Sequence, residues 1–181
     1  MKLLAISGSL NSTSSNTAIV RAIKRIANNA DVTIYTGLGD LPHFNPDLDN
    51  EDAPETVSAF RELIRANDAV LFCTPEYAFG MPGVLKNALD WTVSSGEFVE
   101  KHVIALSASP SFMGGDKALS SLLLTLSALS ALVPQGAQLS IPGITKKLDE
   151  EGELVDQSTE IALKGVLLAL TESLEKQNIL N

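Results

Sequence analysis

The sequence predicts an α/β fold, a three-layer sandwich built on a five-stranded parallel sheet with the strand order 2-1-3-4-5. Short apolar runs alternate with longer stretches of helical period, the pattern that places helices on both faces of a parallel sheet. The apolar runs also differ in composition, which separates central strands from edge strands. The chain has 181 residues, 45% of them hydrophobic, so we expect one domain spanning residues 1–181.

The expected strands are the apolar runs 2–7, 31–36, 69–74, 102–107 and 136–141. The first, third and fourth runs are continuously apolar at their centres, as strands covered on both faces are, whereas the second and fifth alternate with polar residues. We therefore expect the second and fifth strands at the edges. This favours the order 2-1-3-4-5 over 3-2-1-4-5-6, and it predicts ligand binding beyond the carboxyl ends of the first and third strands.

The expected helices follow the strands in order, at 15–28, 54–66, 82–94, 116–132 and 155–176. The first has apolar residues at helical spacing, including Ile19, Ile23 and Ile26, and the fifth has a similar stripe. These stripes are expected to face the core. The stretch 37–53 is a long loop, which is typical of a lid or a partner contact.

Charge and cysteine content limit the possible partners. The net charge of -9, without a basic cluster, argues against nucleic acid and against an anionic membrane. The single cysteine, Cys73, excludes an internal disulfide and a thiolate zinc site, which favours a cytoplasmic location. We expect no signal peptide and no membrane helix. His43 and His102 are isolated, so we expect no metal site and no catalytic side chain of the protein's own.

The loop after the first strand is rich in hydroxyl and amide groups and runs into a helix. Its candidate binding residues are Ser9, Leu10, Asn11, Ser12, Thr13, Ser14, Ser15 and Asn16. Hydroxyls, amides and the backbone N–H groups of a helix start can surround a phosphate dianion without a lysine. The loop lacks the motifs of triphosphate and dinucleotide sites. The alternative is a polar turn with a helix cap.

Two further loops are expected at the same end of the sheet. After the third strand, the backbone of Pro75, Glu76, Tyr77 and Ala78 can hydrogen-bond the polar edge of a flat heterocycle. Tyr77 or Phe79 can cover the ring. Alternatively, the aromatic side chains there pack beneath the loop and Glu76 caps a turn. After the fourth strand, Ser107 and Ser109 precede a Gly-Gly pair, and Ser109 can donate to a ring carbonyl.

These motifs resemble those of the NADPH-dependent FMN reductases, which include chromate, quinone and azo-dye reductases. Gly8-Ser9-Leu10, with Ser14 and Asn16, is similar to the phosphate loop of that family. The flavin-ring motif is matched by Pro75-Glu76-Tyr77, Pro82-Gly83, Leu85-Lys86-Asn87-Ala88 and Asp90-Trp91. The resemblance extends from Lys2 to about the fifth strand.

The resemblance implies a flavodoxin-like fold with FMN as cofactor and NADPH or NADH as reductant. It implies that residues 9–16 hold the FMN phosphate, that residues 75–78 contact the flavin edge, and that Ser107 or Ser109 contacts the ring. It also implies a homodimer or homotetramer. A reduced nicotinamide would stack on the exposed ring and transfer hydride, and a small-molecule acceptor would then take the electrons at the same face.

Three positions depart from the family pattern. Asn11 and Lys117 stand where the family usually has arginine, and Ala78 stands where it usually has asparagine. Each lost hydrogen bond costs about 1–3 kcal/mol, which predicts weaker FMN binding. Two alternatives to a reductase follow: a flavodoxin-type electron carrier that uses the same phosphate loop, and a diverged flavin-binding scaffold without turnover.

Overall fold

The computed structural model describes residues 1–180 and contains one parallel sheet with the strand order β2-β1-β3-β4-β5. The strands are β1 (Lys2–Ser7), β2 (Asp31–Tyr35), β3 (Ala69–Thr74), β4 (His102–Ser109) and β5 (Gln138–Pro142). Every neighbouring pair is parallel. The predicted strand order is confirmed, with the two alternating strands at the edges.

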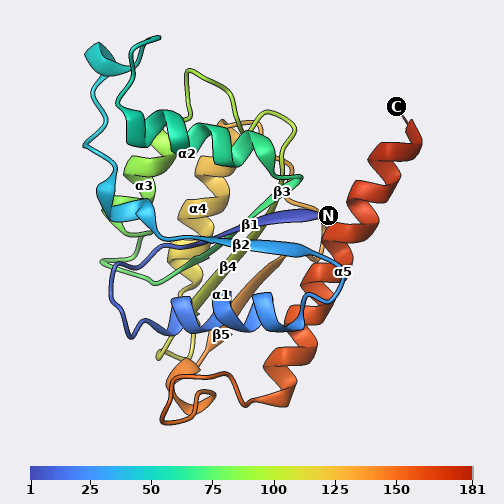
Figure 1. Cartoon of the computed structure of the whole chain (residues 1–181). Helices are drawn as coiled ribbons and strands as arrows, with labels where there is room; N and C mark the ends of the chain where they lie inside the picture. Colours follow the sequence, from blue (N-terminus) through green and yellow to red (C-terminus); the bar gives the residue numbers. More distant parts are fainter. Residues whose placement is uncertain (181) are drawn as a thin grey trace.

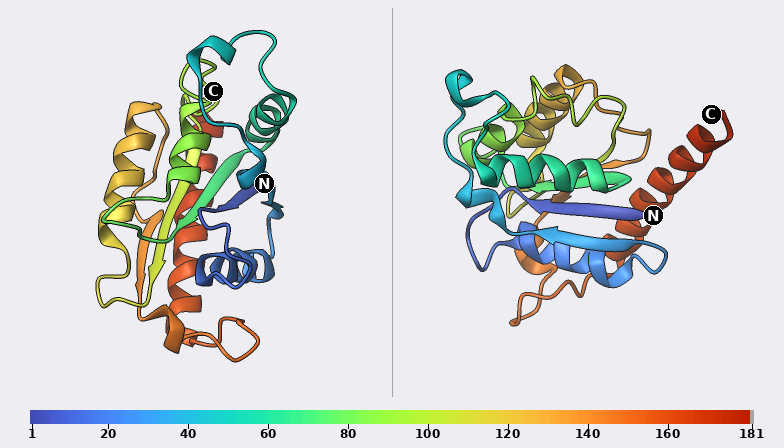
Figure 2. Two further views of the ribbon diagram at one scale, coloured as in Figure 1. Left: turned by 90° about the vertical axis from the view of Figure 1, so that its left-hand side faces the viewer. Right: turned by 45° about the horizontal axis from the view of Figure 1, so that its top comes forward.

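Helices cover both faces of this sheet, as Figure 1 shows. They are α1 (Ser15–Ile26), α2 (Glu55–Ala66), α3 (Gly83–Asp90), α4 (Asp116–Ala128) and α5 (Gln157–Leu180). Short 3-10 turns occur at Gly37–Asp40, Pro46–Leu48 and Ile144–Lys146. The left-hand view in Figure 2 looks onto the edge of the sheet at which the strands end.

Successive residues of each central strand point into two separate cores, because side chains alternate across a strand. In β3, Leu71 and Cys73 pack with the apolar faces of α1 and α5, while Val70 and Phe72 pack with α2, α3 and α4. All four side chains are fully buried. This burial on both faces explains the uninterrupted apolar composition of the central strands.

Three helices end earlier than their sequence pattern predicts, α1 by two residues and α3 and α4 by four residues each. At the end of α3, the carbonyl of Trp91 accepts from the guanidinium of Arg61 and so leaves the helical ladder. At the end of α4, Ala131 N–H bonds Leu126 O and Ser130 N–H bonds Ser127 O, while Ser130 has φ +58°. This is a Schellman motif in which serine takes the position that glycine usually occupies.

The stretch 37–53 is fastened to the body of the protein. The side chain of Asn87 accepts from Phe44 N–H at 2.7 Å and donates to Pro42 O at 2.9 Å. Trp91 Nε1 also donates to Pro42 O, at 2.8 Å. Asp49 forms a buried salt bridge with Arg61 at 2.6 Å. These contacts make the stretch a fixed part of the fold rather than a lid.

Among residues 1–180, no helix is both long and apolar enough to cross a membrane.

Candidate functional site

Three loops meet at the edge of the sheet where the strands end. In Figure 1 the strands run away from the N-terminus, so this edge lies on the left. The loops follow β1 (residues 8–14), β3 (75–82) and β4 (110–115). The sheet reverses its direction of winding between β1 and β3, which is where ligands of open α/β sheets bind.

The loop after β1 is folded by its own side chains. Ser9 Oγ accepts from Asn11 N–H at 3.2 Å, and Asn11 Oδ1 accepts from Thr13 N–H at 3.0 Å. Ser14 caps α1 by accepting from Asn16 N–H at 3.2 Å. The loop therefore contains the capped turn that the sequence left open as an alternative. A polar turn of this kind does not exclude a ligand, because each accepting hydroxyl keeps its own proton to donate.

Gly8 brings this loop close to β3. A Cβ at Gly8 would lie 3.1 Å from both Leu85 Cδ2 and Thr74 Oγ1, and the Gly8 N–H donates to Cys73 O at 2.8 Å. The loop after β1 therefore leaves the sheet directly beside the end of β3.

Asn16 is buried, and its side chain joins α1 to β4. Its Nδ2 donates to Ala108 O at 3.1 Å, and its Oδ1 accepts from Ala108 N–H at 3.2 Å. The same oxygen accepts from the thiol of Cys73 at 3.2 Å. Burial raises the pKa of that thiol well above its usual value, so Cys73 stays protonated. Asn16 thus joins the head of the first helix to β3 and β4.

The remaining predicted residues of this loop lie nearer the surface. Ser9 and Ser15 are half-buried, Ser14 is buried, and Leu10, Asn11, Ser12 and Thr13 are exposed. The first N–H groups of α1 have no carbonyl partner within the helix. One of them, the N–H of Asn16, donates to the Ser14 side chain instead. The loop therefore offers hydroxyl and backbone donors at a helix N-terminus, with no cation among residues 8–16.

The loop after β3 forms a tight hairpin. Tyr77 and Gly80 exchange two backbone hydrogen bonds of 3.0 Å each. The two residues between them, Ala78 and Phe79, have φ +49° and +63°. Positive φ at both central positions defines the mirror-image turn that glycine and asparagine favour. Tyr77, Ala78 and Phe79 are exposed, and Pro75 is half-buried.

Glu76 connects this hairpin to the next loop. Its Oε2 accepts from the N–H groups of Lys117 and Ala118, at 3.0 and 3.1 Å, in the first turn of α4. The residue that precedes α4, Gly115, has no side chain to cap the helix and has φ +83°. A carboxylate from a distant loop therefore takes the place of the local cap and compensates the helix dipole.

The loop after β4 is held against β5. Ser107 is fully buried, and its hydroxyl donates to Gly114 O at 2.8 Å. Ser109 is half-buried, and its Oγ accepts from Ser111 N–H at 3.2 Å. Gly114 has φ +66°, and a Cβ there would lie 2.8 Å from Pro142 N. The Ser109 hydroxyl also donates to Ser111 Oγ at 3.3 Å, an exposed contact that a ligand can replace, whereas the bond from Ser107 to Gly114 is buried.

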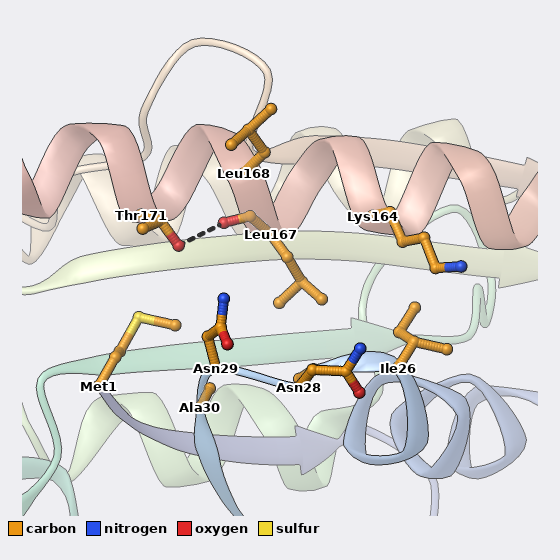
Figure 3. Close-up of a pocket in the computed structure, with 10 residues that line it drawn as sticks. Met1, Ile26, Asn28, Asn29, Ala30, Lys164, Leu167, Leu168 and Thr171 are labelled. Atoms are coloured by element: carbon orange, nitrogen blue, oxygen red, sulfur yellow. Dashed lines mark hydrogen bonds between the residues drawn. The ribbon is translucent and has the colours of Figure 1, made fainter.

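At least four cavities lie outside the space between the loops. A cavity of about 290 Å³, shown in Figure 3, lies at the opposite end of the sheet, where Met1 and Ile26 face Leu167 on α5. A second, of about 680 Å³, lies between Ser12–Ser15 and the acidic segment 149–153. Arg21 also lines this cavity, but it is paired with Glu153 at 3.7 Å. The other carboxylates of the segment repel a phosphate, so this outer side of the loop after β1 does not suit an anion.

The chain is similar to known proteins over most of its length. The model of a family described as NADPH-dependent FMN reductase matches residues 1–146. The chain belongs to this family. A quinone reductase of Escherichia coli K12 is 32% identical over 99% of this chain and 98% of its own length. An NAD(P)H-dependent FMN reductase of Pseudomonas aeruginosa is 35% identical over 94% of this chain and 93% of its own length.

Among solved structures, the flavoenzyme FerB of Paracoccus denitrificans, an NAD(P)H:acceptor oxidoreductase, is similar over 97% of each chain. The two share 29% sequence identity, with a TM-score of 0.80. The predicted flavodoxin-like fold and the predicted family are confirmed by these findings.

Proposed function

We propose that this FMN reductase family member binds FMN non-covalently and uses NADPH or NADH to reduce quinones, flavins or similar small acceptors. The observation that carries the proposal is the meeting of three ligand-type loops at the switch point between β1 and β3. The names of the relatives, which include quinone reductase and NAD(P)H-dependent FMN reductase, agree with it.

The donors in the loop after β1 fit the phosphate of FMN. We assign the phosphate to the hydroxyls and N–H groups of residues 9–15, at the N-terminus of α1, on the side that faces the other two loops. Such a site needs no cation, because N–H groups and the helix dipole favour an anion. Asn11 supplies no positive charge, so we expect binding to be reversible.

The other two loops fit the flat ring. We assign the polar edge of the ring to the backbone of residues 75–78 and one ring carbonyl to the hydroxyl of Ser109. Asn16, Glu76 and Ser107 are assigned as positioning residues, because their side chains hold the loops together. When bound, FMN supplies the hydride and electron chemistry, and the protein positions the ring and its partners.

We further propose that residues 1–181 function as a single domain, as a homodimer or homotetramer in the cytoplasm. The oligomer is supported by large exposed apolar side chains away from the loops, such as Leu124 and Ile161, at 76% and 62% exposure. The location is supported by the buried, unpaired Cys73. Sedimentation velocity tests the oligomer.

The deciding experiment is the visible spectrum of the purified protein, recorded anaerobically with added FMN before and after NADPH or NADH. We expect a flavin band that sediments with the protein and bleaches with either reductant, followed by reoxidation on addition of a quinone. The variant Asn11→Arg serves as a matched comparison, because it restores a cation beside the phosphate loop and should tighten FMN binding about tenfold.

Other results point to the alternatives. A flavin band that bleaches only when a partner reductase is added would identify an electron carrier. A protein that takes up no FMN, while retaining its fold by circular dichroism, would identify a scaffold without turnover.

A further inference from the structure

We propose that Phe79 and Phe112 are specificity-determining residues that select planar, apolar, uncharged acceptors by packing against them at the entrance to the flavin site. This inference rests on the proposed function, and it names the class of acceptor that the site prefers.

The first observation is the exposure of apolar side chains around the three loops. Phe79 is 80% exposed and Phe112 is 87% exposed. The large exposed apolar side chains on the three loops, which we call the apolar rim, are Leu10, Tyr77, Phe79, Phe112 and Met113. Each loop contributes at least one of them. An exposed apolar group of this kind indicates a binding surface.

The second observation is that Phe79 is held in a strained conformation. Its φ of +63° lies in the left-handed region, which costs a side chain other than glycine free energy. The two hydrogen bonds between Tyr77 and Gly80 fix the hairpin that carries it. Strained residues that the surrounding structure holds in place are concentrated at binding sites. The hairpin thus presents an aromatic ring to solvent at a fixed position.

Phe112 is presented on an equally fixed loop. Ser111 N–H donates to Ser109 Oγ at 3.2 Å, and Ser111 O accepts from Gly143 N–H at 3.1 Å. Close packing of Gly114 against Pro142 holds the other end of the loop. The carboxylate of Glu76 joins this loop to the Phe79 hairpin through α4. Both aromatic rings therefore stand on loops that are fixed to each other at the same edge of the sheet.

Charge decides between apolar and anionic acceptors. The exposed Lys117 is the cation nearest in sequence to the rim, and it is paired with Asp116 at 3.4 Å. The chain carries a net charge of -9. An anionic acceptor therefore gains little attraction at the rim, whereas a flat uncharged ring gains stacking and buried apolar area. A naphthoquinone has this chemistry.

The test uses the FMN-loaded protein and the variants Phe79→Ser, Phe112→Ser and the double variant. Val155→Ser is the control, because Val155 is an exposed apolar residue just before α5, outside the three loops and not assigned to the subunit interface. The Kd of oxidised 2-methyl-1,4-naphthoquinone is measured by calorimetry without reductant. The kcat and KM are measured with that quinone and with ferricyanide, a charged acceptor that does not stack.

We expect the double variant to raise the Kd and KM of the quinone about tenfold, with kcat, the KM of ferricyanide and the Kd of FMN within twofold of wild type. The control should change none of these values. The inference is overturned if quinone affinity is unchanged, or if both acceptors lose affinity equally.

A second copy of the chain is the other possible occupant of the rim. If the double variant dissociates an oligomer in sedimentation velocity and its quinone Kd stays at the wild-type value, the rim is a subunit interface and the inference is overturned. A wild-type protein that binds FMN and reduces acceptors, with variants that behave identically, refutes only the inference. A wild-type protein that reduces no acceptor refutes the proposed function as well.

Discussion

Replacing Asn16 by alanine removes a side chain that joins the head of α1 to β4 and β3. The change deletes the donor to Ala108 O and the acceptor for Ala108 N–H, two contacts of 3.1 and 3.2 Å in a buried position. Each buried group left unpaired costs about 1–3 kcal/mol, so we expect the two groups together to lower the free energy of unfolding by about 2–6 kcal/mol. Domains of this size are stable by about 5–15 kcal/mol, so a wild type near the middle of that range leaves the variant folded at 25 °C.

The assay is urea unfolding followed by circular dichroism, with Asn28→Ala as the control because Asn28 is exposed just beyond the same helix. We expect a lower midpoint with an unchanged slope for Asn16→Ala, and a lower melting temperature. The control should stay within about 0.5 kcal/mol of wild type. If Asn16→Ala loses no more stability than Asn28→Ala, the contacts with Ala108 do not stabilise the fold.

Three further predictions concern backbone strain and pH. Ala78→Gly relieves a positive φ and should raise the free energy of unfolding, measured in urea, by about 0.5–1 kcal/mol. The control Ala162→Gly, in the interior of α5, should lower it by a similar amount. If both variants change the free energy of unfolding in the same direction, the turn geometry is contradicted. Ser130→Gly, at φ +58° in the Schellman motif, should raise the thermal midpoint by roughly 2–4 °C, and a lower midpoint would refute this reading. Burial, together with the charge of Lys101, lowers the pKa of His102 below its usual 6.5, so folding favours the neutral ring and stability should fall as the pH drops below about 6.5. His102→Gln should flatten that part of the stability profile, and an unchanged profile would exclude His102 as its cause.

Much of the fold was predictable because a strand's position in the sheet determines how apolar its residues are. A strand buried on both faces is apolar at its centre, as β1, β3 and β4 are, whereas β2 and β5 alternate because water reaches one side of them. The cap of α1 was also visible, since Ser14 acts on a residue only two positions away. Signals of this kind are local and can be read along the chain.

The contacts that assemble the site are not local, and sequence reasoning missed them. Asn16 meets Ala108 across 92 positions, and Glu76 meets Lys117 across 41. No sequence motif in either segment indicates which distant residue it contacts. Similarly, Ala78 and Phe79 adopt positive φ without being glycine or asparagine, so neither signalled the turn. Phe79 and Phe112 could have been noticed in the sequence, because they are apolar residues in polar loops. Only the structure shows that both side chains are exposed to solvent.

The cap that Glu76 supplies to α4 makes the helix and the hairpin thermodynamically linked. A ligand that stabilises the hairpin must, by the reciprocity of linked equilibria, also slow local opening at the start of α4. The amides of Lys117 and Ala118 then become reporters of occupancy. Their deuterium uptake should slow when a ligand binds the hairpin, because the Glu76 carboxylate connects the two.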